Sequence, residues 1–259
     1  MTLVQTQTKA NSAKRLEGKV AIVTGGSRGI GAAIALRLAA DGATVALTYA
    51  NSKDSAEKLV KQIEELGSRA LAVKANVGTE SDNANLVKEV SKAFGKIDIL
   101  VNNAGVFDGG PIDAVELKQY DKIFDVNVKG LIATTIAALP QFNDGGRIIN
   151  ISSGAATMTM AGFSIYSASK AAVDTLTRIW AQDLGKRQIT VNTVSPGTTQ
   201  TDMFEAAIPP EARTAMAEKT ALGRIGTPED IADVVAWLAS GEARWITGKV
   251  IGVDGGITI

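Results

Sequence analysis

The most constraining feature of the sequence is an alternation, repeated along the chain, of short apolar runs with longer segments of helical periodicity. The run "KVAIVTG" (19–25) ends in glycine, as a buried strand does before a turn, and "GIGAAIALRLAADG" (29–42) then has helical spacing. Strands that alternate with helices of about twelve residues or more imply right-handed βαβ crossovers and a parallel sheet covered on both faces. We therefore predict an α/β fold of the doubly wound type.

The rest of the chain continues this alternation. We expect further strands at 43–50, 69–77, 97–105, 146–153, 189–197 and 248–256, and further helices at 52–67, 80–95, 113–138, 164–187 and 228–240. A chain of 259 residues, 45% of them hydrophobic, is long enough for one large core, so we assign 16–259 to a single domain. The polar segment 1–15 is predicted to be a flexible tail, and the irregular segment 197–226, called the lid below, is predicted to cover the substrate.

Charge and composition restrict the partners of the chain. The 27 Lys and Arg residues balance the 27 Asp and Glu residues, so nothing indicates binding to nucleic acid or to an anionic membrane. No apolar run approaches the roughly 20 residues of a membrane span, and the N-terminus lacks the apolar core of a secretory signal. We therefore expect a cytoplasmic protein that acts on a small molecule.

The chain contains neither cysteine nor histidine. Their absence excludes disulfides, thiol nucleophiles, Ser-His catalysis and the commonest zinc ligands, and no metal site is predicted from the spacing of the remaining ligand types. Any proton transfer must therefore come from another residue type. Tyr166 and Lys170, in "YSASK", offer one answer because side chains at i and i+4 share one face of a helix.

A glycine-rich segment, "TGGSRGIG" (24–31), lies between the first expected strand and the first expected helix. In that context the first glycine permits a tight turn, and the later ones let the backbone and the helix N-terminus approach a pyrophosphate. The spacing Gly-x3-Gly-x-Gly differs from the older dinucleotide fingerprint, and a plain strand–helix turn would have the same flanks. We favour dinucleotide binding. The predicted contacts in this loop are Gly25, Ser27, Arg28, Gly29, Ile30 and Gly31.

The residues at the end of the second strand distinguish NAD-binding from NADP-binding proteins. An acidic residue there would hold the ribose 2′-hydroxyl of NAD, but the first carboxylate after this strand is Asp54. Asn51 and Ser52 can donate hydrogen bonds to a 2′-phosphate, and Arg28 can reach the same place. We therefore predict NADP(H) in preference to NAD(H), the alternative being that Arg28 is a solvated loop charge.

Three side chains form a set suited to carbonyl chemistry. A free tyrosine has a pKa of about 10, and a nearby ammonium favours the phenolate, so Lys170 is expected to lower the pKa of Tyr166. Ser153, at the carboxyl end of the fifth strand, could hydrogen-bond a carbonyl oxygen as negative charge develops on it. Each feature alone has an ordinary explanation, as a helix-surface pair or a turn serine. Their joint occurrence at the strand ends of one sheet favours catalysis.

The chain after about residue 16 resembles the short-chain dehydrogenase/reductase family. The motifs that carry the resemblance are, in order, "TGGSRGIG" (24–31), "NNAG" (102–105), "VNVKG" (126–130), "ISS" (151–153), "YSASK" (166–170), "SPGTTQTDM" (195–203) and "VDGG" (253–256). The resemblance implies a single Rossmann-type domain with a seven-stranded parallel sheet. It also implies a homotetramer, the common assembly in the family.

The resemblance further implies a catalytic tetrad. Tyr166 would be the general acid in carbonyl reduction, or the base in alcohol oxidation, and Ser153 would polarise the carbonyl oxygen. Lys170 would lower the pKa of Tyr166 and bind the nicotinamide ribose. Asn127 would hold a water molecule of a proton relay behind Lys170, although it could merely cap a bend in its helix. The hydride itself would come from the cofactor.

Other cofactor contacts are implied outside the glycine loop. They are Asn76 and Val77 near the adenine, Asn103, Ala104 and Gly105 near the adenosine ribose, and Pro196, Gly197, Thr199 and Thr201 near the nicotinamide. Asn76 departs from the aspartate that the family commonly has. Its side-chain carbonyl can still accept a hydrogen bond from the adenine amino group, so we expect binding to be retained.

The sequence says less about the substrate. Small and apolar residues follow the catalytic serine and begin the lid, so the expected pocket walls are Met158, Met160, Phe163 and Phe204, unless these residues simply pack. We predict a carbonyl reductase or secondary alcohol dehydrogenase that acts on a ketone or aldehyde.

Two alternatives remain open. One is a 3-oxoacyl carrier-protein reductase, whose acidic partner would need a basic mouth; Lys186 and Arg187 supply cations, whereas Asp144 opposes them. The other is an NADP(H)-binding regulatory protein without catalysis, since a fold alone does not determine function.

Overall fold

The computed structural model of the chain describes residues 14–258, so nearly all of the predicted tail lies outside the described range. Within this range the strands form one seven-stranded sheet in the order β3-β2-β1-β4-β5-β6-β7, and every pairing is parallel. The strands are β1 (Val20–Val23), β2 (Thr44–Tyr49), β3 (Ala70–Lys74), β4 (Ile97–Asn102), β5 (Phe142–Ile151), β6 (Thr190–Pro196) and β7 (Val250–Val253). The predicted doubly wound, seven-stranded parallel sheet is confirmed.

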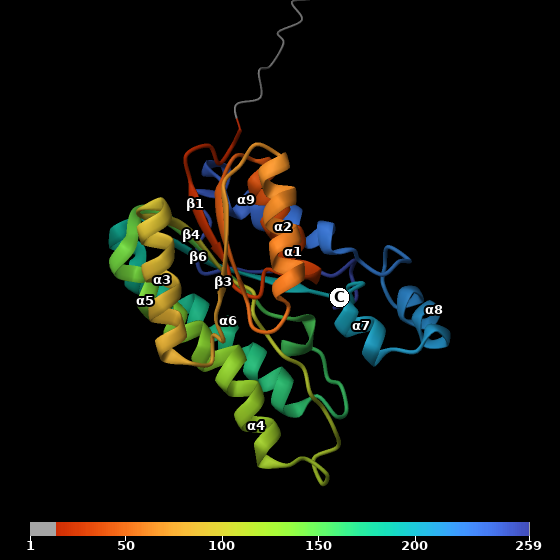
Figure 1. Cartoon of the computed structure of the whole chain (residues 1–259). Helices are drawn as coiled ribbons and strands as arrows, with labels where there is room; N and C mark the ends of the chain where they lie inside the picture. Colours follow the sequence, from red (N-terminus) through yellow and green to blue (C-terminus); the bar gives the residue numbers. More distant parts are fainter. Residues whose placement is uncertain (1–13, 259) are drawn as a thin grey trace, which may run out of the picture.

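Helices cover both faces of this sheet (Figure 1). One face is covered by α1 (Gly29–Ala40), α2 (Lys53–Glu65) and α9 (Pro228–Ala239), and the other by α3 (Glu80–Phe94), α5 (Leu131–Ala138) and α6 (Ser164–Leu184). The segment expected to be one long helix begins later than predicted, as α4 (Leu117–Phe124), and reaches α5 through a π-helical turn, Asp125–Gly130. The layers are therefore helix, sheet and helix, as alternation along the sequence predicted.

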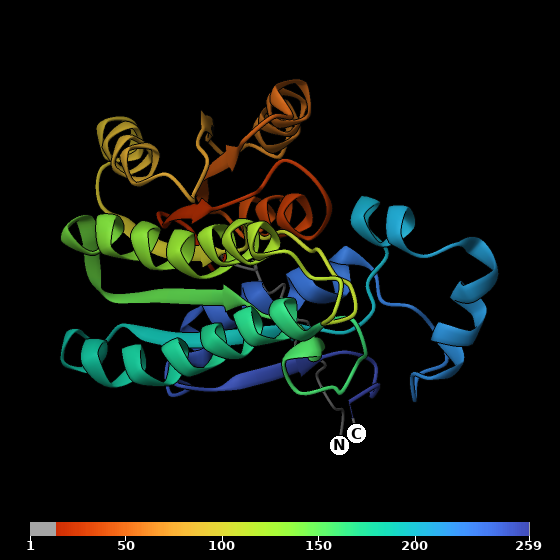
Figure 2. The ribbon, with the colours of Figure 1, turned by 90° about the horizontal axis from the view of Figure 1, so that it is seen from below.

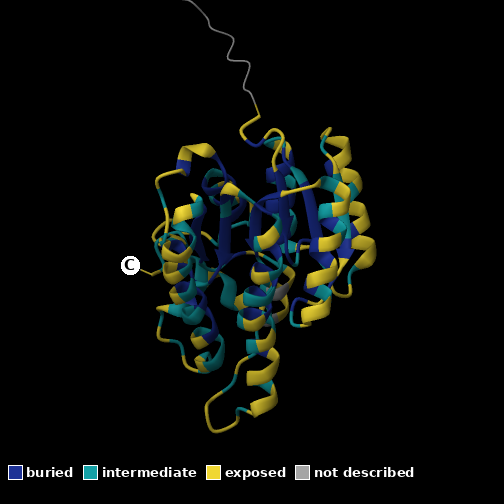
Figure 3. Cartoon of the chain, turned by 90° about the vertical axis from the view of Figure 1, so that its left-hand side faces the viewer, coloured by how far each residue is buried: buried dark blue, intermediate teal, exposed yellow. Residues whose placement is uncertain are grey.

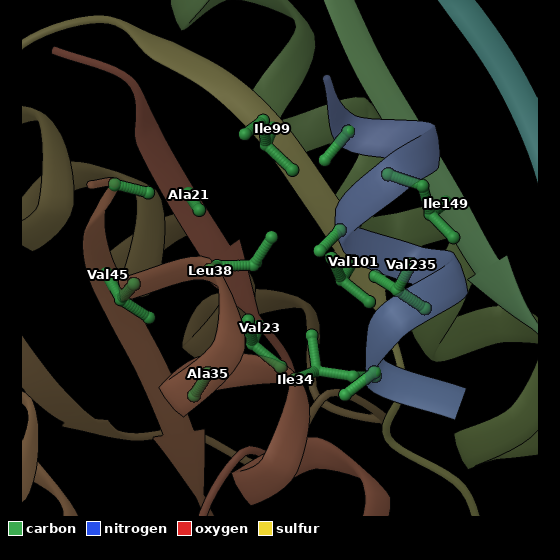
Figure 4. Close-up of a cluster of buried hydrophobic side chains, with 14 of the residues drawn as sticks. Ala21, Val23, Ile34, Ala35, Leu38, Val45, Ile99, Val101, Ile149 and Val235 are labelled. Atoms are coloured by element: carbon green, nitrogen blue, oxygen red, sulfur yellow. The ribbon is translucent and has the colours of Figure 1, made fainter. Parts of the chain in front are cut away.

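The strands are buried because both of their faces carry apolar side chains. Along β1, Ala21 and Val23 belong to the cluster under α1 and α9, whereas Val20 and Ile22 belong to the cluster on the opposite face. Figure 4 shows the first cluster, in which Leu38 of α1 is one of the fully buried side chains. Figure 3 shows buried strands between helices whose outer faces are exposed.

One helical stretch, Leu117–Gln141, has the length and hydropathy of a membrane span, with a mean hydropathy of 1.3 and 39% of the tested window buried. The expectation that no run approaches this limit is therefore wrong by length and composition. The stretch includes α5, which packs against α3 and β4. A helix in the core of a globular domain passes the same test, so the finding is weak evidence for a membrane.

The lid, which the sequence predicted to be irregular, contains two short helices, α7 (Asp202–Ala207) and α8 (Pro210–Glu218). Figure 2 shows them standing away from the body of the domain. Helix α8, all of which is described, buries none of its residues. The lid is tied back to the domain at its end, where the amide of Leu222 donates a hydrogen bond of 3.1 Å to the carbonyl of Gly255.

Candidate active site

The carboxyl ends of the central strands meet at one edge of the sheet. Val23 pairs with Val101, Asn102 pairs with Asn150, and Ile151 pairs with Val194. This register places the glycine turn, "NNAG", "ISS" and "SPG" at neighbouring strand ends, as the sequence predicted. Ligands of open parallel sheets bind at such an edge, so these segments define the candidate site.

The glycine turn closes onto the loop after β4. A Cβ on Gly25 would lie 2.9 Å from the Cα of Ala104, so only glycine permits this approach. The side-chain amide of Asn103 donates to the carbonyls of Thr24 and Gly25, at 2.9 and 3.1 Å. Asn103, predicted as a ribose contact, therefore also holds the glycine turn in place.

Two threonines that the sequence reading missed complete this junction. The hydroxyl of Thr24 accepts hydrogen bonds from the amides of Asn103 and Ala104, both at 3.0 Å, and the hydroxyl of Thr48 accepts from the amide of Gly25 at 2.9 Å. Both side chains are buried at strand ends. Thr24 could have been identified from the sequence, because it directly precedes the first glycine of the turn.

The N-terminus of α1 fits an anionic group. Its first turn carries no acidic side chain, and within the described part of the chain the side chain of Arg28, the N-cap residue, makes no capping hydrogen bond. The first amides of the helix are therefore available to a pyrophosphate. Gly29 has a φ of +53°, and a Cβ on it would lie 3.5 Å from the methyl group of Thr201, so the start of the lid lies over the turn.

A Cβ on Gly31 would lie 2.4 Å from the carbonyl oxygen of Gly25. Gly31 is thus required by the packing of the turn itself, whatever the turn binds. Ser27 and Ile30 lie half-buried in the same turn. The glycine turn that the sequence predicted is a compact, closed loop, and its binding of a dinucleotide stays a prediction.

The residues predicted for the adenosine half lie at the ends of β2 and β3. Asn51 is exposed, and Ser52 is the N-cap residue of α2. The side-chain carbonyl of Asn76 accepts a hydrogen bond of 3.1 Å from the amide of Gly78. An amide oxygen has two lone pairs, so Asn76 keeps an acceptor for an adenine amino group. Val77 is buried.

The residues predicted for the nicotinamide half follow β6. A Cβ on Gly197 would lie 2.7 Å from Asp254, so the loop after β6 is pressed against the loop after β7. Pro196 ends β6 and pairs with Val253. The hydroxyl of Thr199 donates to the carbonyl of Gly197 at 3.0 Å, and Thr201 caps α7 by accepting from an amide at 3.2 Å.

Helix α6 carries Tyr166 and Lys170 on one face, as predicted. Lys170 is 4% exposed, and its ammonium donates a hydrogen bond of 2.9 Å to the carbonyl of Ile151 at the end of β5. Its Nζ lies 5.9 Å from the centroid of the Tyr166 ring. Ser153 follows two residues after Ile151 and accepts a hydrogen bond of 3.2 Å from the amide of Ala155. The structure thus brings the three side chains together.

Asn127 lies in the π-helical turn and is buried, a local geometry that is often found at functional sites. Its side chain accepts from the amide of Val106 at 2.8 Å and donates to the carbonyl of Val106 at 3.0 Å. It also donates to the hydroxyl of Ser169 at 3.1 Å. A Cβ on Gly105 would lie 3.4 Å from both Asn127 Oδ1 and Lys170 Nζ, so Asn127 is adjacent to the lysine.

Burial governs the charges of the site. It lowers the pKa of Lys170 to about 8, while the charge of Asp174, one turn further along α6, raises it. Burial also raises the pKa of Tyr166, whereas a hydrogen bond with Ser153 lowers it. We expected Lys170 to lower the pKa of Tyr166. This expectation is wrong for the net shift: the pKa is raised overall, because desolvation of the phenol dominates.

Asp174 was not singled out from the sequence. It is 6% exposed, and its Oδ1 has no hydrogen-bond partner among residues 14–258. Burial raises the pKa of this carboxyl, and a hydrogen bond with Ser152 and the charges of Arg178 and Lys170 lower it. Its position at i+8 from Tyr166 on the same helix face was the sequence signal that could have identified it.

The cations proposed for a carrier-protein mouth lie elsewhere. Arg187 bonds to Asp144 at 2.8 Å and to the carbonyls of Leu139 and Phe142 at 3.1 and 2.7 Å. These residues precede β5 or begin it, so they lie at the amino ends of the strands. The sequence-based suggestion that Lys186 and Arg187 could line the mouth is therefore wrong.

The chain is similar over nearly its whole length to known oxidoreductases. Residues 25–258 match the family described as enoyl-(acyl carrier protein) reductase. An oxidoreductase of Methylorubrum extorquens is 45% identical over 245 residues, which cover 94% of this chain and 99% of that protein. Versicolorin reductase 1 of Aspergillus parasiticus is 43% identical over 254 residues, which cover 93% of this chain and 97% of that protein.

A crystal structure of a short chain dehydrogenase from Burkholderia cenocepacia in complex with NADP is similar throughout. It has a TM-score of 0.90 and 46% identity, and the match covers 95% of this chain and 100% of that chain. The chain belongs to the short-chain dehydrogenase/reductase family, which confirms the resemblance seen in the sequence.

Proposed function

We propose that this chain is an NADP(H)-dependent carbonyl reductase, or secondary alcohol dehydrogenase, with Tyr166 as the acid–base residue. The observation that carries the proposal is a desolvated phenol beside Ser153, next to a buried lysine at the strand ends. Because burial raises the pKa of Tyr166, the phenol keeps its proton at neutral pH. A tyrosine in this state suits the donation of a proton to a carbonyl oxygen.

The roles of the side chains follow from their positions. NADPH, when bound, supplies the hydride. The glycine turn and the free amides of α1 would bind its pyrophosphate. The hydroxyl of Ser153 would orient the carbonyl oxygen toward Tyr166, which would give its proton to that oxygen. The ammonium of Lys170, held by the carbonyl of Ile151, would favour the phenolate that remains.

Substitution of Tyr166 tests the catalytic role. The variant Tyr166→Phe should lose about 10²-fold or more in kcat for NADPH-dependent ketone reduction, because the proton donor is removed. NADPH binding, measured by fluorescence titration, should be unchanged. The matched control is Tyr120→Phe, since Tyr120 is an exposed tyrosine of α4. Unchanged turnover of Tyr166→Phe would refute the mechanism.

The preference for NADP(H) is proposed on the residues that follow β2 and on Arg28. Arg28 is exposed at the start of α1, and its guanidinium belongs to the glycine turn itself. The variant Arg28→Ala should weaken NADPH binding about tenfold or more and leave NADH binding nearly unchanged, because it removes a charged hydrogen-bond donor. Equal loss for both cofactors would refute the preference.

A 3-oxoacyl carrier-protein reductase is the second candidate, and the description of the matching family favours it. The location of Arg187 at the opposite end of the strands weighs against it. NADPH oxidation with an acetoacetyl thioester, compared with simple ketones of similar size, separates the two. Faster turnover of the thioester would move this candidate to first place.

A catalytically idle NADP(H)-binding protein is the third candidate. The presence of both Tyr166 and Lys170 in a desolvated pair weighs against it. We also propose a homotetramer, as the family resemblance implied, and a location in the cytoplasm, as the composition led us to expect. Ile136 of α5 and Ile179 of α6, 64% and 56% exposed, are apolar side chains that such an assembly could cover. Gel filtration that gives a monomer would contradict the tetramer.

A further inference from the structure

Two phenylalanines flank the phenol of the candidate site. The ring of Phe107 lies 5.1 Å from the ring of Tyr166, edge to face at 81°. The ring of Phe163 lies 4.9 Å from Phe107 and 6.5 Å from Tyr166. Phe107 comes from the loop after β4, and Phe163 directly precedes α6. Segments far apart in the sequence therefore build one aromatic cluster around Tyr166.

The aromatic cluster lies outside the main hydrophobic core. Within residues 14–258 neither phenylalanine belongs to the two hydrophobic clusters that cover the faces of the sheet. Both rings are half-buried, so each keeps a surface that other groups can contact. Phe163 was expected as a pocket wall, whereas Phe107 was not foreseen from the sequence.

The backbone on both sides of Phe107 is fixed. The residue before it, Val106, is held at its amide and carbonyl by Asn127, at 2.8 and 3.0 Å. Three residues after it, the amide of Gly110 donates to the carbonyl of Gly162 at 2.9 Å. The second bond joins the loop of Phe107 to the segment of Phe163, so the two rings are positioned together.

The loop is also fixed by the side chain that follows Phe107. The carboxylate of Asp108 accepts from Gln119 at 3.1 Å, from Lys122 at 3.2 Å and from the amide of Gly109 at 3.0 Å. These hydrogen bonds lower the pKa of Asp108. A Cβ on Gly109 would lie 3.3 Å from the ring of Phe107, so the ring is packed against the loop. A wall held in this way keeps its geometry when a substrate binds.

We infer that Phe107 and Phe163 form an aromatic wall that selects flat, aromatic ketones for reduction at Tyr166. The inference rests on the proposed carbonyl reductase function and names its substrate class. A planar aryl ketone can present its ring to the wall edge to face or offset, as aromatic pairs prefer, and it loses little conformational freedom on binding. A linear ketone of equal size lacks the ring and must fix several rotatable bonds.

The test compares two methyl ketones with eight carbons each, acetophenone and 2-octanone, in NADPH-dependent reduction. The wild-type protein should prefer acetophenone in kcat/KM. The variant Phe107→Leu, which keeps an apolar side chain but removes the ring, should lose about tenfold for acetophenone and less than twofold for 2-octanone. Phe163→Leu should act in the same direction. The matched control is Phe124→Leu, because Phe124 stacks on Tyr120 in α4.

The outcomes of this test distinguish a misfolded variant, a failure of the aromatic wall and a failure of the proposed function. NADPH affinity that is unchanged in Phe107→Leu shows that the variant is folded. Equal losses for both ketones, or no loss for acetophenone, would overturn the aromatic wall while leaving the carbonyl reductase intact. A wild-type protein that binds NADPH but reduces neither ketone would overturn the proposed function and the wall with it.

Discussion

A buried polar network joins the three strands that carry the site. Asn102, Asn150 and Thr193 are register neighbours on β4, β5 and β6. Asn102 donates to the carbonyl oxygen of the Asn150 side chain at 2.9 Å and to the hydroxyl of Thr135 on α5 at 3.1 Å. The amide of Asn150 and the hydroxyl of Thr193 both donate to Thr177 of α6, at 2.8 and 2.7 Å. The network thus links α6, which carries Tyr166, the proposed acid–base residue, to the sheet.

The variant Thr177→Val removes the hydroxyl on which these bonds converge and keeps the volume nearly constant. Thr177 is fully buried, and its hydroxyl also donates to the carbonyl of Val173 at 2.9 Å. Each buried donor left without an acceptor costs about 1–3 kcal/mol. The hydroxyl of Thr193 can rotate toward another acceptor, whereas the amide of Asn150 cannot. We therefore expect a loss of about 1–3 kcal/mol in the free energy of unfolding, the cost of one orphaned donor.

Urea unfolding, followed by circular dichroism at fixed protein concentration, measures this loss. With a slope of about 3 kcal/mol/M, the urea midpoint should fall by about 0.3–1 M. The control is Thr175→Val, because Thr175 is exposed on the same helix and its hydroxyl accepts a long, 3.3 Å hydrogen bond from the exposed Arg178. That variant should stay within about 0.5 kcal/mol of the wild type. A Thr177→Val midpoint indistinguishable from that of Thr175→Val would refute the role of the network.

Three further substitutions test the site and its support. Gly31→Ala should abolish NADPH binding in titrations, because its Cβ would lie 2.4 Å from a backbone carbonyl oxygen. The pKa of Lys170, about 8, predicts that kcat/KM falls as the pH rises through 8, when the ammonium is lost. The variant Asp174→Asn should shift the fall in kcat/KM to lower pH, because the Asp174 carboxylate raises the pKa of Lys170. The control Asp183→Asn, at an exposed position of the same helix, should leave the pH profile unchanged. Hydrogen bonds from Arg224 and Thr227 lower the pKa of Asp230 to about 2. The ionised carboxylate should therefore stabilise the folded chain above about pH 4, and this contribution should be lost as the pH falls towards 2. Acid unfolding of Asp230→Asn should lack this pH-dependent contribution.

The sequence predicted the parts of the fold that depend on local patterns. The periodicity of β1 and α1 marked the glycine turn, and the spacing of Tyr166 and Lys170 placed both on one face of α6. The order of the strands was not predictable from periodicity, because alternation implies parallel strands without saying which strands are neighbours. The resemblance to a known family supplied the seven-stranded Rossmann-type sheet.

The missed features depend on contacts between distant segments. Hydrophobic periodicity predicted one helix from about 113, whereas the chain begins α4 at Leu117 and makes a π-helical turn that directs Asn127 to the loop after β4. An extra residue in one turn leaves little trace in a periodic pattern. Phe107 lies in an irregular loop, where no pattern assigns a direction to a side chain. Its contact with Phe163 exists only after the loops of β4 and β5 have met.

The shift in the pKa of Tyr166 also could not be predicted from the sequence, because it depends on burial in the folded chain. The spacing of Tyr166 and Lys170 correctly indicated adjacency, but adjacency gives only the charge–charge contribution to a pKa. Desolvation depends on the burial of both groups in the folded chain, and it disfavours the charged form of each. The pKa of the phenol therefore rises, while that of the ammonium falls to about 8. Near pH 7 the phenol is therefore protonated and most of the lysine is charged. A site in this state holds the proton that carbonyl reduction consumes, whereas alcohol oxidation must first remove it, so we expect the oxidation to need higher pH than the reduction.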